Sequence, residues 1–224
     1  MMRLILTSCL VSALAMTAWA EDAKKAEAKA DSSGFVQLFN GKDMTGWKMH
    51  PDAKDSKWEV VDGALTASGN KASHLFSDRG DYTDFVYRME AKINDKGNSG
   101  QYFRAKFQPG FPQGYEAQIN FGHSDKIRTG SLYPAFNRRL PKEQRDKIIV
   151  LKNMHKADEW FTQEVTAIGN HIVIKVDGVT AVDFVDENKT YMKGHFAIQY
   201  HDPTCKISVR KVEVKELTPE SKGG

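Results

Sequence analysis

The sequence predicts an all-β domain, a sandwich or barrel of antiparallel strands, and three observations lead to this prediction. Segments in which apolar and polar residues alternate recur along most of the chain. Turn signals rich in Gly, Asn and Asp separate these segments. Helical patterns are scarce, and the one clear candidate, residues 139–151, should begin after Pro141. We therefore expect at most one or two short helices.

The alternation places the expected strands in chain order. They cover residues 85–93, 101–107, 114–121, 164–184, 195–201 and 206–217. Asp177-Gly178 divides the fourth segment, and this two-residue turn signal predicts a β-hairpin. In the last segment the apolar phase changes near Arg210-Lys211, which predicts a β-bulge. The segment GNSG, residues 97–100, is interpreted as a tight turn because Gly and Asn tolerate positive φ.

The two ends of the chain differ in composition from the part between them. Residues 1–20 contain one Arg, an apolar run and the triplet Ala18-Trp19-Ala20, as expected of a signal peptide cleaved after Ala20. An alternative is lipoprotein processing at Cys9. Residues 21–33 and 219–224 lack the apolar residues needed for a core, which predicts a flexible tether and a disordered tail around a domain at 34–218. We therefore expect an exported protein, periplasmic or extracellular, without a membrane span.

Charge and cysteine content exclude some functions. The formal net charge is only +3, which gives no support for nucleic-acid binding, since that function favours a basic stripe. Cys205 is the only cysteine after residue 20, so the exported protein would have no internal disulfide. Its stability must then come from a hydrophobic core.

A polar strip on the strand of residues 114–121 is the first candidate for a site. Glu116, Gln118 and Asn120 alternate with apolar residues and should project from one side of the strand. Neighbouring strands offer further polar side chains that could share this face: Tyr102 and Arg104, and also His195, Gln199 and His201. Amides, carboxylates and Arg bind sugar hydroxyls, while aromatic rings cover their apolar faces. The rings could come from Tyr102, Tyr133 and Trp160, and the alternative is an ordinary solvated surface.

The sequence lacks the motifs of some enzyme classes. No Ser lies in a nucleophile elbow, and neither HExxH nor CxxC occurs. His123 follows a Gly in an expected loop, where a surface role competes with a catalytic one. Glu and His side chains could bind a divalent metal, but no ligand spacing requires one, so no cofactor is expected.

Seven segments in the same order resemble those of the family once called DUF1080. FVQLFNGKDMTGWK (35–48) and WEVVDGAL (58–65) resemble its opening, and NSGQYFR, GYEAQI and TGSLY resemble its middle motifs. Two segments that begin at residues 158 and 194 resemble its closing part. The resemblance covers residues 35–217. Two positions depart from the family pattern, Trp160-Phe161 and Val209-Arg210-Lys211-Val212.

The resemblance implies a fold and a reaction. The family is described as 3-keto-disaccharide hydrolases, also as 3-keto-glucoside 1,2-lyase/3-keto-2-hydroxy-glucal hydratases, with a concanavalin A-like jelly roll of two antiparallel sheets. The reaction needs a base at C2, a group that stabilises an enolate, and an acid for the leaving oxygen. We hypothesise Glu116 as the base, Arg104 as the stabiliser, and His201 or His123 as the acid. Tyr102, Gln118, Asn120, Tyr133, Trp160 and Gln199 would bind the 3-keto sugar or glycan.

Two other functions fit the same features. The polar face could bind glycans without catalysis, as a lectin-like module. A glycosidase acting on ordinary glycosides needs two carboxylates about 5–9.5 Å apart across the bond. The sequence offers Glu116 but no convincing second carboxylate on its face, so this function ranks third.

Overall fold

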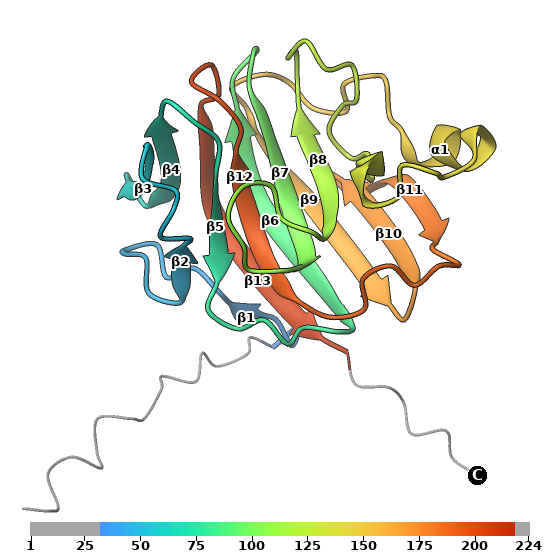
Figure 1. Ribbon diagram of the computed structural model, residues 1–224. Helices are drawn as coiled ribbons and strands as arrows, with labels where there is room; N and C mark the ends of the chain where they lie inside the picture. The colour runs from blue at the N-terminus through green and yellow to red at the C-terminus, as the bar shows by residue number, and fades with distance from the viewer. Residues whose placement is uncertain (1–31, 218–224) are drawn as a thin grey trace, which may run out of the picture.

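Two antiparallel β-sheets packed face to face form the protein, as shown by a computed structural model that describes residues 32–217 (Figure 1). This confirms the predicted all-β jelly-roll sandwich. The expected signal peptide and tail, and all but the last two residues of the expected tether, lie outside the described residues. Within 32–217, none of the helices has the length and apolar character that crossing a membrane requires.

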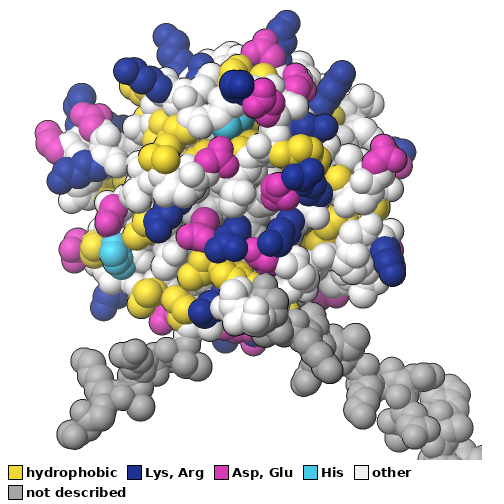
Figure 2. All heavy atoms as spheres, turned by 180° about the vertical axis from the view of Figure 1, so that it is seen from behind, with side chains coloured by type: hydrophobic (Ala, Val, Ile, Leu, Met, Phe, Trp, Pro, Cys, Tyr) yellow, Lys and Arg dark blue, Asp and Glu magenta, His cyan; other side chains and the backbone are white. Residues whose placement is uncertain are grey.

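The larger sheet has eight strands in the order β11-β10-β9-β6-β13-β4-β3, with β1 added beside β13. Its strands are β1 (Val36–Gln37), β3 (Ser56–Val61), β4 (Ala64–Gly69), β6 (Phe85–Ile93), β9 (Trp160–Ile168), β10 (His171–Val176), β11 (Val179–Val185) and β13 (Ile207–Glu216). Lys, Arg, Asp and Glu side chains mix across the back of the molecule (Figure 2). The intermixed charges are typical of a solvated surface.

The smaller sheet has five strands in the order β2-β5-β12-β7-β8. They are β2 (Trp47–Met49), β5 (Ser73–Ser77), β7 (Asn98–Ala105), β8 (Tyr115–Asn120) and β12 (His195–Tyr200). The predicted turn at 97–100 is therefore wrong for its last three residues, because the strand already begins at Asn98. Pairing with β8 from Asn98 onward satisfies this backbone in place of a turn.

The core lies between the two sheets and follows from the alternation in the sequence. On β6, every second residue from Phe85 to Ile93 is buried, and its neighbours are partly exposed. Phe196 of the smaller sheet stacks on Tyr87 of the larger one, with ring centroids 4.0 Å apart. Such aromatic contacts add to the burial of apolar area that holds the two layers together.

Three local predictions are confirmed. Asp177 and Gly178 join β10 to β11 with φ values of 48° and 79°, as a type I′ hairpin requires. The pairing of β13 with β6 shifts register between Val209 and Lys211, which is the expected bulge. Helix α1 (Lys142–Ile148) begins directly after Pro141, and a 3-10 helix η1 (Pro134–Phe136) precedes it.

The outer face of the smaller sheet is covered in part by loops (Figure 1). The segment between β7 and β8 and the segment between β8 and α1 cross this face. All six residues of β8 are buried: Tyr115, Ala117 and Ile119 belong to the core, whereas Glu116, Gln118 and Asn120 have little exposure although they are polar. The polar side of this strand is therefore not an ordinary wet face but the floor of a covered region.

Candidate active site

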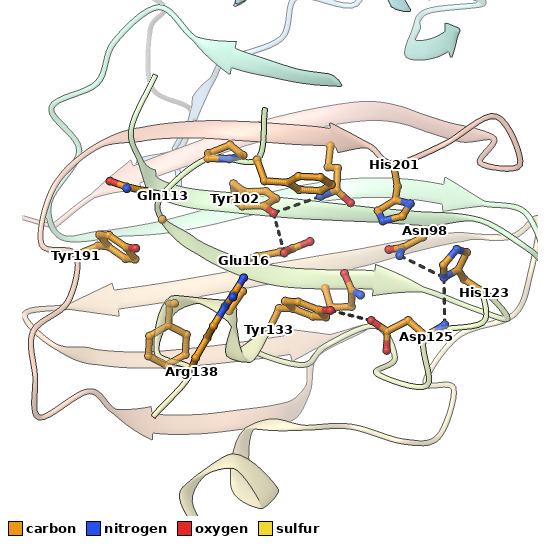
Figure 3. Close-up of a pocket in the computed structure, with 17 residues that line it drawn as sticks. Asn98, Tyr102, Gln113, Glu116, His123, Asp125, Tyr133, Arg138, Tyr191 and His201 are labelled. Atoms are coloured by element: carbon orange, nitrogen blue, oxygen red, sulfur yellow. Dashed lines mark hydrogen bonds between the residues drawn. The ribbon is translucent and has the colours of Figure 1, made fainter. Parts of the chain in front are cut away.

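A cavity of about 410 Å³ opens on the outer face of the smaller sheet. Its floor comes from β7, β8 and β12, and its walls come from the loops that cross the face (Figure 3). The side chains that line it include Asn98, Tyr102, Phe111, Glu116, Gln118, His123, Asp125, Tyr133, Arg138, Gln199 and His201. The structure thus brings together seven of the ten predicted site residues: Tyr102, Glu116, Gln118, His123, Tyr133, Gln199 and His201.

Glu116 lies on the cavity floor with little solvent around its carboxyl group. It is 7% exposed, and burial raises its pKa to about 8, with the Asp125 charge adding to the shift. The Tyr102 hydroxyl donates to Glu116 Oε2 at 2.8 Å and opposes this shift. Once its amide is turned over, Gln118 donates to Glu116 Oε1 at 3.2 Å and to the Ser99 carbonyl at 2.8 Å. Two neutral donors therefore hold both oxygens of a carboxyl group that gains and loses a proton near neutral pH.

Gly100 makes room for this carboxyl group. It lies opposite Gln118 on the neighbouring strand β7. A Cβ atom at position 100 would overlap the Oε1 atom of Glu116. The missing side chain is therefore a requirement of the site, beyond the backbone freedom that glycine brings.

A polar chain continues from Tyr102 across the sheet. Gln199 Nε2 donates to the Tyr102 hydroxyl at 3.2 Å and lies 3.4 Å from His74 Nε2. His74 is buried, and desolvation, with the nearby His201 charge, lowers its pKa to about 3, which keeps it neutral. The Oε1 atom of Gln199 is buried and has no partner among the described residues.

His123, His201 and Asp202 form a cluster at one end of the cavity. His201 Nδ1 donates to Asp202 Oδ2 at 2.7 Å, and His123 Nε2 lies 3.4 Å from the same oxygen. Burial opposes ionisation of Asp202, yet hydrogen bonds from Thr204 and His201 lower its pKa. One ligand atom from each of the three residues lies within 4.8 Å of the others, so the group could hold a metal ion.

A second carboxylate lines the cavity, contrary to the expectation from the sequence. Asp125 lies in the loop after β8, and its Oδ2 accepts the hydroxyl of Tyr133 at 2.9 Å. Asn120 holds this loop, because its Nδ2 donates to the carbonyls of Asp125 and Ile127, each at 2.9 Å. Asn120 does not line the cavity, so the prediction that it binds sugar is wrong. It shapes the cavity wall instead.

The prediction that Arg104 shares the face of Tyr102 is wrong. Arg104 has φ of 49°, and the pairing of β7 with β12 loses its register here. This bulge reverses the alternation, so the guanidinium group turns away from the cavity and is buried. It donates to the Thr83 carbonyl at 2.7 and 2.9 Å and to the Gly169 carbonyl at 2.6 Å. Arg104 therefore secures loops at the end of the sandwich and cannot stabilise an enolate in the cavity.

Trp160 is also misplaced by the sequence-based prediction. It lies on β9 of the larger sheet, where its ring is flanked by the cations of Lys92 and Arg210, at 5.0 and 4.3 Å. The cavity lies on the smaller sheet, so Trp160 cannot stack on a sugar bound there. Phe111, which is 55% exposed at the mouth of the cavity, offers an aromatic surface instead.

Sequence reasoning missed His74, Asn98, Asp125 and Asp202. Asn98 belongs to the NSG motif, and Asp202 directly follows His201, so both lie beside residues that the pattern had singled out. Only the strand order could have placed His74 beside Gln199, since more than a hundred residues separate them. His195 shares the outer face as predicted, but its ring lies near Phe76 and Phe107, and it does not line the cavity.

Comparison with known proteins agrees with this architecture. Residues 34–215 match the family profile described as a 3-keto-alpha-glucoside-1,2-lyase-like domain. No curated protein matches the chain. A structure from Parabacteroides distasonis ATCC 8503, described as a candidate glycosyl hydrolase, is 20% identical with a TM-score of 0.67, covering 85% of this chain and 99% of that one.

Two carbohydrate-binding proteins share the fold at lower identity. The module CBM66 from Bacillus subtilis is 16% identical with a TM-score of 0.53, covering 77% of this chain and 97% of its own. The VIP36 exoplasmic/lumenal domain in its Ca²⁺/Man3GlcNAc-bound form is 10% identical with a TM-score of 0.58, covering 87% of this chain and 92% of its own. At these identities the similarity establishes the fold. The profile match covers most of the sequence, and the chain therefore belongs to the family of 3-keto-alpha-glucoside-1,2-lyase-like domains, whose function is related to carbohydrates.

Proposed function

We propose that this protein cleaves glycosides that carry a ketone at C3 of the sugar, by elimination followed by hydration. The observation that carries the proposal is the buried Glu116 carboxyl on the cavity floor, with its pKa raised to about 8. A ketone at C3 acidifies the C2 proton, and removing that proton requires a base whose pKa lies near the working pH. Family membership supports this reaction class for the chain.

Each step can be assigned to groups that line the cavity. Glu116 takes the C2 proton, and the electron pair of the C–H bond moves to form a C3 enolate. When the ketone re-forms, a double bond forms between C1 and C2 and the C1–O bond breaks. A proton donor then neutralises the departing oxygen, which leaves a 2-hydroxy-3-keto-glucal. Addition of water, with OH at C1 and H at C2, yields the free 3-keto sugar.

His201 is the better acid of the two predicted candidates. Its Nδ1 donates to Asp202, which leaves Nε2 for a substrate in the cavity. His123 has both nitrogens engaged: Nδ1 accepts the Asp125 backbone N–H at 3.2 Å, and Nε2 faces Asp202. With Arg104 outside the cavity, a protonated imidazole of the same cluster could also provide positive charge that stabilises the enolate.

The test is turnover of a defined substrate. Incubation with a 3-keto-disaccharide, followed by NMR, should show release of the free sugar or the 2-hydroxy-3-keto-glucal. The matched disaccharide without the ketone should remain intact, because its C2 proton is not acidic. Cleavage of both substrates at similar rates would contradict the proposal and favour a glycosidase that uses Glu116 and Asp125.

A non-catalytic glycan-binding module is the second candidate. The amide side chains of Asn98, Gln118 and Gln199 line the cavity and suit sugar hydroxyls, and the similar folds include a carbohydrate-binding module. If the protein only binds glycans, the 3-keto-disaccharide should shift protein NMR signals from the cavity and should be recovered unchanged. Binding without product would therefore replace the proposed lyase activity with a lectin-like one.

A further inference from the structure

We propose that His123, His201 and Asp202 bind one divalent transition-metal ion. The three side chains come from two segments of the sequence: His123 from the loop after β8, and His201 and Asp202 from the residues directly after β12. Two imidazoles and a carboxylate are the ligand types that favour zinc and other first-row ions over Mg²⁺ and Ca²⁺. His123 and His201 line the cavity, so water or substrate could complete the coordination sphere.

The spacing of the donor atoms suits such an ion. Nitrogen and oxygen ligands at about 2.1 Å from a metal lie ~3.0–3.4 Å from one another in octahedral or tetrahedral geometry. His123 Nε2 lies 3.4 Å from Asp202 Oδ2. The His201 pair is closer, at 2.7 Å, as fits a direct N–H···O hydrogen bond that an ion would widen.

Asn98 could supply the supporting contact that metal-bound histidines need, once its amide is turned over. In such sites the second ring nitrogen donates its N–H to a carbonyl or carboxylate oxygen. Asn98 Nδ2 lies 3.4 Å from His123 Nδ1, and Asn98 Oδ1 is buried without a partner among the described residues. Turning this amide over would bring Oδ1 to His123 Nδ1. A proton moved from Nε2 to Nδ1 would then donate to Asn98 Oδ1, in place of the Asp125 backbone N–H that Nδ1 now accepts at 3.2 Å, and Nε2 would be free for the ion.

The ion would stand where the proposed reaction lacks a cation. Arg104 is outside the cavity, and Arg138 is the one Lys or Arg among its described lining residues, exposed at the rim. A divalent ion at the cluster could polarise the C3 ketone, and a water molecule bound to it could replace His201 as the acid. This role rests on the proposed function, whereas ion binding itself does not.

Binding is tested on the untagged protein after treatment with a chelator. Titration with Zn²⁺ in a calorimeter should give one site per chain, and Co²⁺ should give visible absorption bands from the bound ion. Excess Mg²⁺ should not compete. His201→Ala and Asp202→Asn should weaken binding by more than ~100-fold, and Asn98→Ala by ~10–100-fold. Circular dichroism verifies that each variant is folded.

His171→Ala is the matched control. His171 pairs with Asp183 at 2.7 Å on the larger sheet, away from the cavity, so this variant removes a similar pair without touching the cluster. It should bind Zn²⁺ like the wild type. Absence of stoichiometric binding, or binding that both His201→Ala and Asp202→Asn leave intact, would overturn the proposed site.

Assays with a 3-keto-disaccharide separate the two proposals. Activity lost with the chelator and restored by the ion supports both. Full activity without any ion overturns the electrophilic role and leaves the lyase function standing. Ion binding with no cleavage under any condition supports the metal site and contradicts the lyase function.

Discussion

Tyr102 donates its hydroxyl to Glu116 Oε2 at 2.8 Å, across neighbouring strands at the floor of the cavity. The bond favours the charged carboxylate, while burial favours the neutral acid, and burial has the larger effect. The balance leaves a carboxyl group that can exchange a proton near neutral pH. The proposed chemistry depends on this balance, and the first three predictions probe it.

Glu116→Gln should reduce kcat for 3-keto-disaccharides by ~10²–10⁴-fold, the usual contribution of a positioned base. Gln keeps the shape and can still accept the Tyr102 hydroxyl, so the fold should persist. Steady-state kinetics and circular dichroism measure the two effects. Glu59→Gln, on β3 of the other sheet, is the control and should retain full activity. Wild-type turnover in Glu116→Gln would rule out Glu116 as the base.

The pH profile of kcat/KM should rise with an apparent pKa of about 8, because only ionised Glu116 accepts a proton. Rates measured from pH 6 to pH 9.5, with a control for effects of the buffer itself, give the profile. A profile that is flat between pH 7 and pH 9 would show that another group limits the reaction.

Tyr102→Phe should raise the apparent pKa of the profile further, by up to about one unit, since the lost hydrogen bond favours the carboxylate. At pH 7 a smaller fraction of the enzyme would then be ionised, and the rate should fall. Tyr200→Phe removes a hydroxyl that is bonded to Gly69 at 2.9 Å and should leave the profile unchanged. A lower apparent pKa for Tyr102→Phe would contradict the assigned direction of this contact.

Stability should depend on pH through the same carboxyl group. Its folded pKa is raised, so between about pH 4.5 and pH 8 the folded state retains a proton that the unfolded state has lost. The free energy of unfolding therefore falls with rising pH in this window and levels off above it. Glu116→Gln removes the cost of ionising a buried carboxyl group. The free energy of unfolding of this variant, relative to that of the wild type, should therefore increase by about 2–4 kcal/mol across the window. Urea titrations at pH 5 and pH 8.5 measure it, and an advantage that shrinks with pH would contradict the raised pKa.

Arg104→Met should lower the free energy of unfolding by about 2–4 kcal/mol, because the carbonyl groups of Thr83 and Gly169 lose a buried charged donor. The folded fraction should retain kcat within a few-fold, since the guanidinium group does not line the cavity. Arg139→Met, at an exposed position, should change stability by less than about 0.5 kcal/mol. If Arg104→Met instead abolished turnover without destabilising the fold, the sequence-based assignment of a catalytic Arg would be restored.

Alternation in the sequence predicted most of the fold because it reports which face of each strand is buried. It located β6, the hairpin at Asp177-Gly178 and the bulge in β13. It failed at Arg104, where a single residue with positive φ reverses the alternation without any marker in the residue type. It also could not tell which sheet carries Trp160, since pairing between distant strands sets that. Glu116 was found because three polar residues in a row on one strand face are unusual.

The space beside Glu116 couples two positions on neighbouring strands. Because a Cβ at position 100 would overlap Glu116 Oε1, Gly100→Ala must displace the carboxyl group or the strand. In a Glu116→Ala background that conflict is absent, so the same Gly100→Ala change should cost little additional stability. The two positions are therefore epistatic, and a directed-evolution library that varies position 100 alone would see only losses. Varying both positions together would give access to side chains at position 100 that Glu116 excludes.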